Sequence, residues 1–241
     1  MMQRHIALGV LFLIAVPAVV ASQIPDPIAT AMTAHGGTAR LAAIQGIRIK
    51  GQATRMGVSA AITISARTSG EVRIDYDQPL NRSFVNAAAP FEIADGKQTF
   101  KQPHTGAFGR LDLLSILGVA PYLAATKTFV GRTSAPSGMV DRYEARTSDE
   151  KVFYRRTLED RVKVDFDTGT GRIAGIARQQ FAEQSLDHPF TLSHAFSDYR
   201  VVNGVVLPFR IDIAVDGNVK ETILVDSIQL NPIFLRDLFE R

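Results

Sequence analysis

"FSDYRVVNGVVLPFRIDIAVDG", residues 196–217, places Asn203–Gly204 between two apolar runs. Beyond this pair every odd-numbered position from Val205 to Val215 is apolar, whereas the even positions include Arg210 and Asp212. Such alternation is typical of a β-strand with one buried and one exposed face. Asn-Gly favours a type I′ hairpin turn, because both central residues must tolerate positive φ. The stretch therefore predicts a hairpin with a long apolar face that something must cover.

Strand character extends over most of the chain. Three runs, 47–57, 59–67 and 71–79, are separated by Gly or Ser-Gly, which is the spacing of an antiparallel meander. A segment rich in Thr, Ser, Gly and Pro at 131–138 is expected to be a loop. The other strand-like runs are 82–86, 91–102, 139–147, 152–158, 161–167, 172–181 and 220–231.

Helices are few and short in this interpretation. Asp26 and Pro27 form an N-cap and first-turn signal for a helix that ends at Gly36–Gly37. Thr38 is expected to cap a second short helix. The apolar segment 110–126 is interrupted by glycine and proline and predicts one or two short buried helices. A last short helix is expected over 232–240.

About ten strands and three or four short helices define an α+β architecture. Too little helix is present to cover a flat sheet, so the antiparallel sheet is expected to curve into a half-barrel closed by short helices. No composition break or internal repeat divides the chain. One domain is therefore expected over residues 23–241.

The first 22 residues predict a secretory signal peptide. Arg4 and His5 precede an apolar run from Ile6 to Val16, and the small residues Ala21 and Ser22 offer the cleavage site. An uncleaved membrane anchor is the alternative, although the run is shorter than the roughly 20 residues that span a bilayer. The chain has no cysteine, so neither a disulfide nor lipidation on a thiol is available, and a soluble exported protein is expected.

The charge balance and the lack of catalytic motifs argue against nucleic-acid binding, catalysis and metal binding. The 27 basic and 24 acidic residues are nearly balanced, which gives no reason to expect a nucleic-acid partner. Neither a Gly-x-Ser-x-Gly elbow, a His-Glu-x-x-His pair nor a P-loop is present, so we expect no enzyme, no catalytic residue and no cofactor. The stretch 165–172 resembles the start of a calcium loop, but Gly169 replaces a ligand and the sequence is better explained by a turn, so no metal is expected.

What the chain has in excess is apolar surface that faces one way. Each buried methylene group contributes about 0.8 kcal/mol, so an acyl chain can be held without a strong polar contact. We therefore hypothesise an apolar cavity between the sheet and a helical lid. Its expected lining is Ile49, Ile62, Ile64, Val72, Ile74, Tyr76, Leu114, Leu117, Leu207, Phe209 and Ile211.

Four segments carry a resemblance to a known group of proteins. They are "AHGGTARLAAIQGIRIKG" (34–51), "VKVDFDTGTGRIAGI" (162–176), "FSDYRVVNGVVLPFRIDI" (196–213) and "SIQLNP" (227–232). As an ordered set they resemble the LolA/LolB-like outer-membrane lipoprotein-sorting superfamily. Because the chain lacks a cysteine that could be lipidated, the resemblance is to the soluble carrier or to its less defined relatives. Arg48 and Arg73 lie in the early strands, but neither sits in a motif that matches the carrier's arginine.

The resemblance implies a periplasmic carrier or chaperone that binds the acyl chains of lipoproteins or other lipids. Its partners would be an inner-membrane donor and an outer-membrane acceptor, and the protein would act as a monomer. The alternative is a non-enzymatic sensor or interaction domain on the same fold, which binds lipid or polypeptide to regulate an envelope partner.

Overall fold

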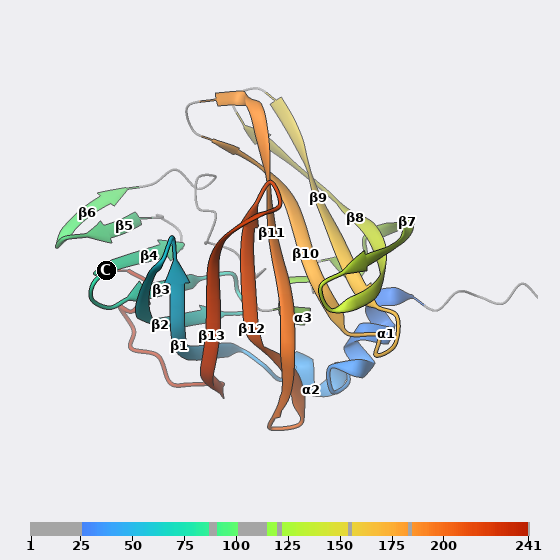
Figure 1. The fold of residues 1–241 in the computed structure, drawn as a ribbon, viewed down its shortest axis with the longest axis horizontal. Coiled ribbons are helices and arrows are strands. Elements are labelled where there is room, and N and C mark those ends of the chain that lie inside the picture. The colour runs from blue at the N-terminus through green and yellow to red at the C-terminus, as the bar shows by residue number, and fades with distance from the viewer. Residues whose placement is uncertain are drawn as a thin grey trace, which may run out of the picture.

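A computed structural model describes residues 26–86, 91–100, 115–119, 122–153, 156–182 and 185–240. The expected signal peptide lies outside these residues. The described chain forms one curved antiparallel sheet of 13 strands with short helices (Figure 1). The strands are β1 (Gly46–Arg55), β2 (Val58–Arg67), β3 (Val72–Tyr76), β4 (Arg82–Asn86), β5 (Phe91–Ala94), β6 (Lys97–Phe100), β7 (Thr126–Ala135), β8 (Gly138–Phe153), β9 (Arg156–Asp167), β10 (Ile173–Ala182), β11 (Ser185–Val202), β12 (Val205–Val215) and β13 (Asn218–Leu230).

Two meanders make up the sheet: the first contains β1 to β6 and the second contains β7 to β13. The strand order is β6-β5-β4-β3-β2-β1-β13-β12-β11-β10-β9-β8-β7, so every neighbour is consecutive in the chain except β1 and β13. The first and last strands pair antiparallel in the middle of the sheet, from Ile47 opposite Leu230 to Arg55 opposite Glu221. This single long-range ladder joins the two halves.

The hairpin predicted over residues 196–217 is confirmed. Asn203 and Gly204 have φ values of 51° and 79°, as a type I′ turn requires, and they join β11 to β12. All odd positions of β12 from Val205 to Ile213 are buried, and Val215 at its end is half-buried. The predicted buried face of this strand is therefore present. The predicted half-barrel class is also confirmed, with 13 strands in place of the ten or so expected.

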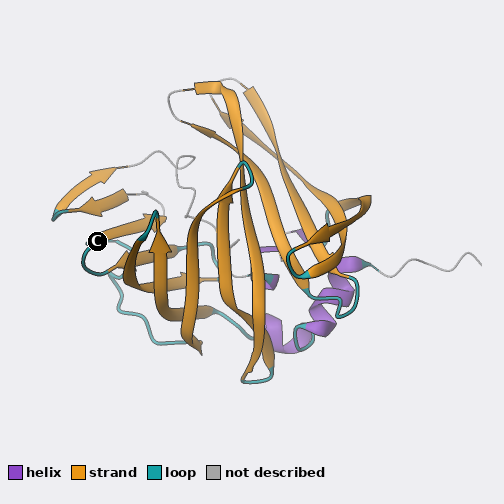
Figure 2. Ribbon diagram, viewed as in Figure 1, coloured by secondary structure: helices purple, strands orange, loops and turns teal. Residues whose placement is uncertain are grey.

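The helices gather at one end of the sheet (Figure 2). They are α1 (Pro27–Ala34), α2 (Thr38–Ala42) and α3 (Ile116–Val119). The Asp26 carboxylate caps α1 by accepting a hydrogen bond from the N–H of Ile28 at 3.0 Å. No helix in the described ranges is long and apolar enough to cross a membrane.

Two expectations about elements were wrong. Residues 131–138 are not a loop, because β7 covers most of them; this edge strand is exposed on both faces and so has no alternation to detect. Thr38 does not cap α2, because Gly37 occupies the N-cap position without a side-chain bond. The expectation of one or two short buried helices over 110–126 is confirmed within the described part, which contains one helix of four buried residues, α3.

The expected helix at 232–240 was also wrong. These residues run across the outer face of the first meander, the face opposite the main core (Figure 1). Phe234 lies under the guanidinium of Arg48 at 5.2 Å, and Arg73 donates to the carbonyl of Leu238 at 3.0 Å. Within the segment the N–H groups of Leu238 and Glu240 form turn hydrogen bonds with the carbonyls of Leu235 and Asp237, and the contacts with the sheet hold these turns in place.

Gly51 allows the central ladder to form. The register between β1 and β13 shifts between Lys50 and Gly51, which marks a bulge. A Cβ atom on Gly51 would lie 2.1 Å from the carbonyl oxygen of Leu224 on the partner strand. Because that oxygen belongs to the backbone, only a shift of β13 could make room.

Gly51→Ala should therefore destabilise the protein by about 2–3 kcal/mol, since an overpacked site forces the backbone to move. Urea unfolding followed by circular dichroism measures the change. Gly175→Ala is the matched control, because Gly175 also follows a bulge but its Cβ would lie 3.2 Å from the nearest backbone atom. The control should cost about 1 kcal/mol or less. Equal losses in the two variants would contradict the proposed role of the close approach.

Candidate lipid-binding face

The inner face is the side of the sheet that carries the main hydrophobic core and meets the helices. Ten of the eleven predicted lining residues belong to this core, and each is at most 7% exposed. Cross-strand pairs bring them together, because Ile64 lies opposite both Ile49 and Ile74, and Ile62 lies opposite Tyr76. Leu114, the eleventh, lies outside the described residues.

The prediction missed a large part of this face. β9, β10 and β11 also contribute buried apolar side chains to it, and the helices α1 and α2 contribute others. Period-two alternation in 162–166 was a usable signal for these strands. The missed residues include Val162, Val164, Phe166, Ile173, Ile176, Leu192, Phe196, Ile28 and Leu41.

α3 covers part of the inner face. All four of its residues are buried, and Leu117 joins the same core as the sheet residues. Ser115, just before the helix, lies 3.0 Å from the hydroxyl of Tyr199 on β11. Tyr199 itself donates to the carbonyl of Ile173, so Ser115 is the donor to Tyr199. This bond fastens the start of α3 to the sheet.

Buried polar groups interrupt the apolar layer on both meanders. The guanidinium of Arg178 on β10 donates to the hydroxyl of Tyr122 and lies 4.9 Å from the centre of its ring. The hydroxyl of Tyr76 donates to Oε1 of Glu221 at 2.7 Å. Burial raises the pKa of the Glu221 carboxyl, and the Tyr76 bond and the charge of Arg55 partly oppose this effect.

His35, at the end of α1, ties the helical end to both β10 and β12. Its Nδ1 lies 2.6 Å from the carbonyl oxygen of Val206, and its Nε2 accepts the N–H of Ile173 at 3.2 Å. The imidazole is therefore neutral with its proton on Nδ1. Burial is the main reason why its pKa falls to about 4, and the charge of Arg172 adds to it.

The residues that resembled a calcium loop form the β9–β10 turn. Oδ1 of Asp167 accepts hydrogen bonds from the N–H groups of Gly169 and Thr170, at 3.1 and 2.7 Å, and from the Thr170 hydroxyl. The carboxylate thus caps its own turn. Within the described ranges, no group of three or more His, Cys, Asp or Glu residues is placed to hold a metal ion.

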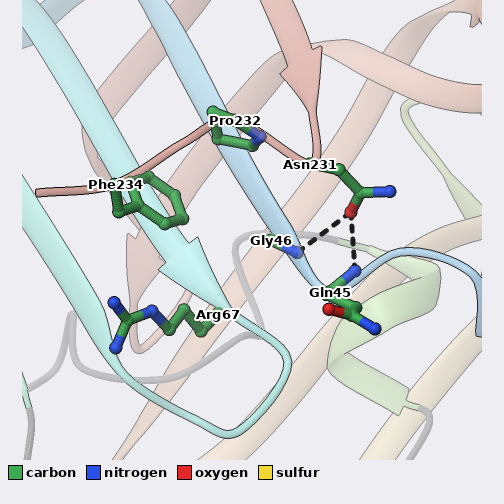
Figure 3. Close-up of a pocket in the computed structure, with 6 residues that line it drawn as sticks. All are labelled: Gln45, Gly46, Arg67, Asn231, Pro232 and Phe234. Carbon is green, nitrogen blue, oxygen red and sulfur yellow. Dashed lines mark hydrogen bonds between the residues drawn. The ribbon is translucent and has the colours of Figure 1, made fainter. Parts of the chain in front are cut away.

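A separate pocket of about 280 Å³ lies between the start of β1, the end of β2 and the last segment (Figure 3). Oδ1 of Asn231 closes one side by accepting from the N–H groups of Gln45 and Gly46. The guanidinium of Arg67 is already paired with Glu71 at 3.2 Å. None of the predicted lining residues lines this pocket, so it is distinct from the inner face.

Comparison with known proteins shows that this chain is similar to solved structures in its fold. No family model matches the sequence, and no curated protein sequence matches it. A domain assigned to outer membrane lipoprotein sorting, from Vibrio parahaemolyticus, superposes with a TM-score of 0.50 at 10% identity, over 80% of this chain and 88% of that one. A DUF1329 family protein from Desulfovibrio piger gives a TM-score of 0.55 at 8% identity, over 88% and 95%. The chain has a LolA-like fold.

In this fold the His35 contacts predict a pH-dependent stability. The unfolded chain binds a proton at His35 below about pH 6.5, but the folded chain does so only below about pH 4. The contribution of neutral His35 to the free energy of unfolding is therefore fully present above pH 6.5 and decreases as the pH drops towards 4. Between pH 7 and pH 4.5 the wild type should lose about 2 kcal/mol through His35 alone.

His35→Gln keeps one donor and one acceptor but does not titrate. Urea unfolding at pH 7 and pH 4.5 should show a loss in the wild type that is about 2 kcal/mol larger than the loss in the variant. Parallel losses in the two proteins would contradict the assigned neutral state.

Proposed function

We propose that this protein is a periplasmic carrier that binds acyl chains of lipids or lipoproteins against the inner face and passes them towards the outer membrane. The observation that carries the proposal is the inner face itself. Both meanders contribute to one apolar layer, and a helix of only four residues, α3, covers part of it. The name of the Vibrio parahaemolyticus domain, which refers to lipoprotein sorting, is in keeping with this use of the fold.

α3 is the element that an acyl chain would replace. A helix of one turn has little stability of its own, so its structure depends on the contacts of its apolar side chains. Those side chains, Ile116, Leu117 and Val119, pack against surface that suits methylene groups equally well. A chain of ten methylenes is worth about 8 kcal/mol when fully buried, which is enough to compete with the contacts of three side chains.

We also propose how the protein reaches its compartment and exchanges its ligand. The signal peptide, residues 1–22, would direct export and leave the domain 23–241 as a monomer in the periplasm. A donor at the inner membrane and an acceptor at the outer membrane would load and unload it. Binding and release alone would suffice for this role, without catalysis.

Native mass spectrometry of the protein purified from an envelope fraction tests the proposal. We expect adducts with the masses of acylated molecules, and a polypeptide mass that begins after Ala21 or Ser22. The emptied protein should also take up a fluorescent fatty acid. A protein that is empty on isolation and fails to bind the fatty acid would favour the sensor alternative over the carrier.

Loosening α3 should speed the uptake of the fluorescent fatty acid. Tyr199→Phe removes the hydroxyl that Ser115 contacts and lowers the cost of moving α3 by about 1 kcal/mol, which corresponds to roughly fivefold faster uptake in stopped-flow fluorescence. Tyr143→Phe is the control, because Tyr143 also joins the core but its hydroxyl has no hydrogen bond within the described part of the chain. An unchanged rate in Tyr199→Phe would exclude α3 as the gate.

A further inference from the structure

Glu221 is the exception in an inward row of apolar side chains. On β13 the inward positions are Glu221, Ile223 and Val225, and all three are buried. Glu221 is 1% exposed and lies opposite Ile213 on β12. A carboxyl group at such a position loses its hydration, which is costly unless hydrogen bonds replace it.

Only one of its two oxygens is satisfied. Tyr76 donates to Oε1, whereas Oε2 is buried and has no hydrogen-bond partner among the described residues. Most buried polar atoms in folded proteins are paired, so an unpaired oxygen requires an explanation. Arg55 lies opposite Glu221 on β1, but its charge acts on the carboxyl without a hydrogen bond to Oε2.

The curvature of the sheet creates this site. Tyr76 is on β3 and Glu221 is on β13, with β2 and β1 between them. In a flat sheet these strands would lie about 14 Å apart and their side chains would stand parallel. The observed bond of 2.7 Å requires the inner face to curl until the two side chains converge. The carboxyl group therefore sits where the two meanders face each other.

The same position adjoins the proposed acyl surface. Tyr76 pairs with Ile62 on β2, and its ring packs edge-on against Phe84 at 6.2 Å. Ile223, two residues from Glu221, belongs to the same core. A ligand chain on this surface would bring its polar end within reach of the carboxyl.

We propose that Oε2 of Glu221 accepts a hydrogen bond from an N–H group of the bound amphiphile, so that the inner face selects acyl chains joined through an amide over those without a donor. This inference rests on the proposed acyl-binding function and adds the chemical class of the ligand. Tyr76 is the positioning residue, since its hydroxyl holds the carboxyl in place. Tyr76 and Glu221 orient the polar end of the bound amphiphile, whereas the apolar inner face supplies most of the binding free energy.

Two probes that differ in a single N–H test the proposal. N-methyldodecanamide has the donor, whereas N,N-dimethyldodecanamide has the same chain and carbonyl but no donor. Each is titrated against protein loaded with a fluorescent fatty acid, and displacement gives its affinity. We expect the wild type to bind the secondary amide about tenfold more tightly than the tertiary amide, as for one hydrogen bond to a buried carboxylate.

Glu221→Gln should abolish this preference, because the side-chain oxygen stays with Tyr76 and the amide NH₂ faces the ligand. Asp226→Asn is the matched control, since Asp226 is an exposed carboxylate on the same strand, and it should keep the tenfold preference. Glu221→Leu is a second variant that removes the buried carboxyl. It should lose the preference and still bind the tertiary amide.

The outcomes separate the two proposals. Equal affinity of the wild type for both amides, or a preference that survives in Glu221→Gln and Glu221→Leu, would overturn the role of Glu221 while leaving acyl binding intact. A wild type that binds neither the amides nor the fluorescent fatty acid would refute the carrier function, and the inference with it.

Discussion

The pairing of β1 with β13 is the constraint on which the rest of the structure depends. Each meander on its own is a sheet with one apolar face and nothing to cover it. Joined through this ladder, the two apolar faces become one inner surface that curves around the helices. The bulge at Gly51 lets the two backbones approach closely at the junction. The contact between Tyr76 and Glu221 spans the same junction from inside.

The inner face stabilises the fold by burying apolar side chains, and it also buries polar groups that lower this stability. Apolar residues stabilise the fold by their burial, and they alone would make a better core without Glu221 or Arg178. These polar groups are nevertheless buried on the same surface, each with a tyrosine as a partner. A protein that only had to remain folded could gain stability by replacing both members of each pair with apolar side chains. Their presence is easier to understand if the face must also orient a ligand.

Local patterns predicted the strands that have one buried face. The hairpin at 196–217 was evident because β12 alternates strictly and Asn203–Gly204 imposes the turn. β7 was missed because an edge strand exposed on both sides leaves no period in the sequence. The C-terminal segment was assigned as a helix because its stabilising contacts, with Arg48 and Arg73, come from strands some 160 residues or more earlier. Nine of the proposed lining residues lie together on the sheet because strand alternation identifies a face. The partner of a buried carboxyl is a property of curvature, and no local pattern encodes it.

The position of β13 has a consequence for how the chain acquires its structure. β1 is the first strand in the chain and β13 is the last, yet they are neighbours at the centre of the sheet. A chain that emerges gradually from a ribosome or a translocation channel cannot complete the sheet until almost all of it is free. Until then the edge of β1 and the apolar side of the first meander are exposed to other chains. The topology therefore makes folding a late event, slow because its decisive contact is the most distant in sequence.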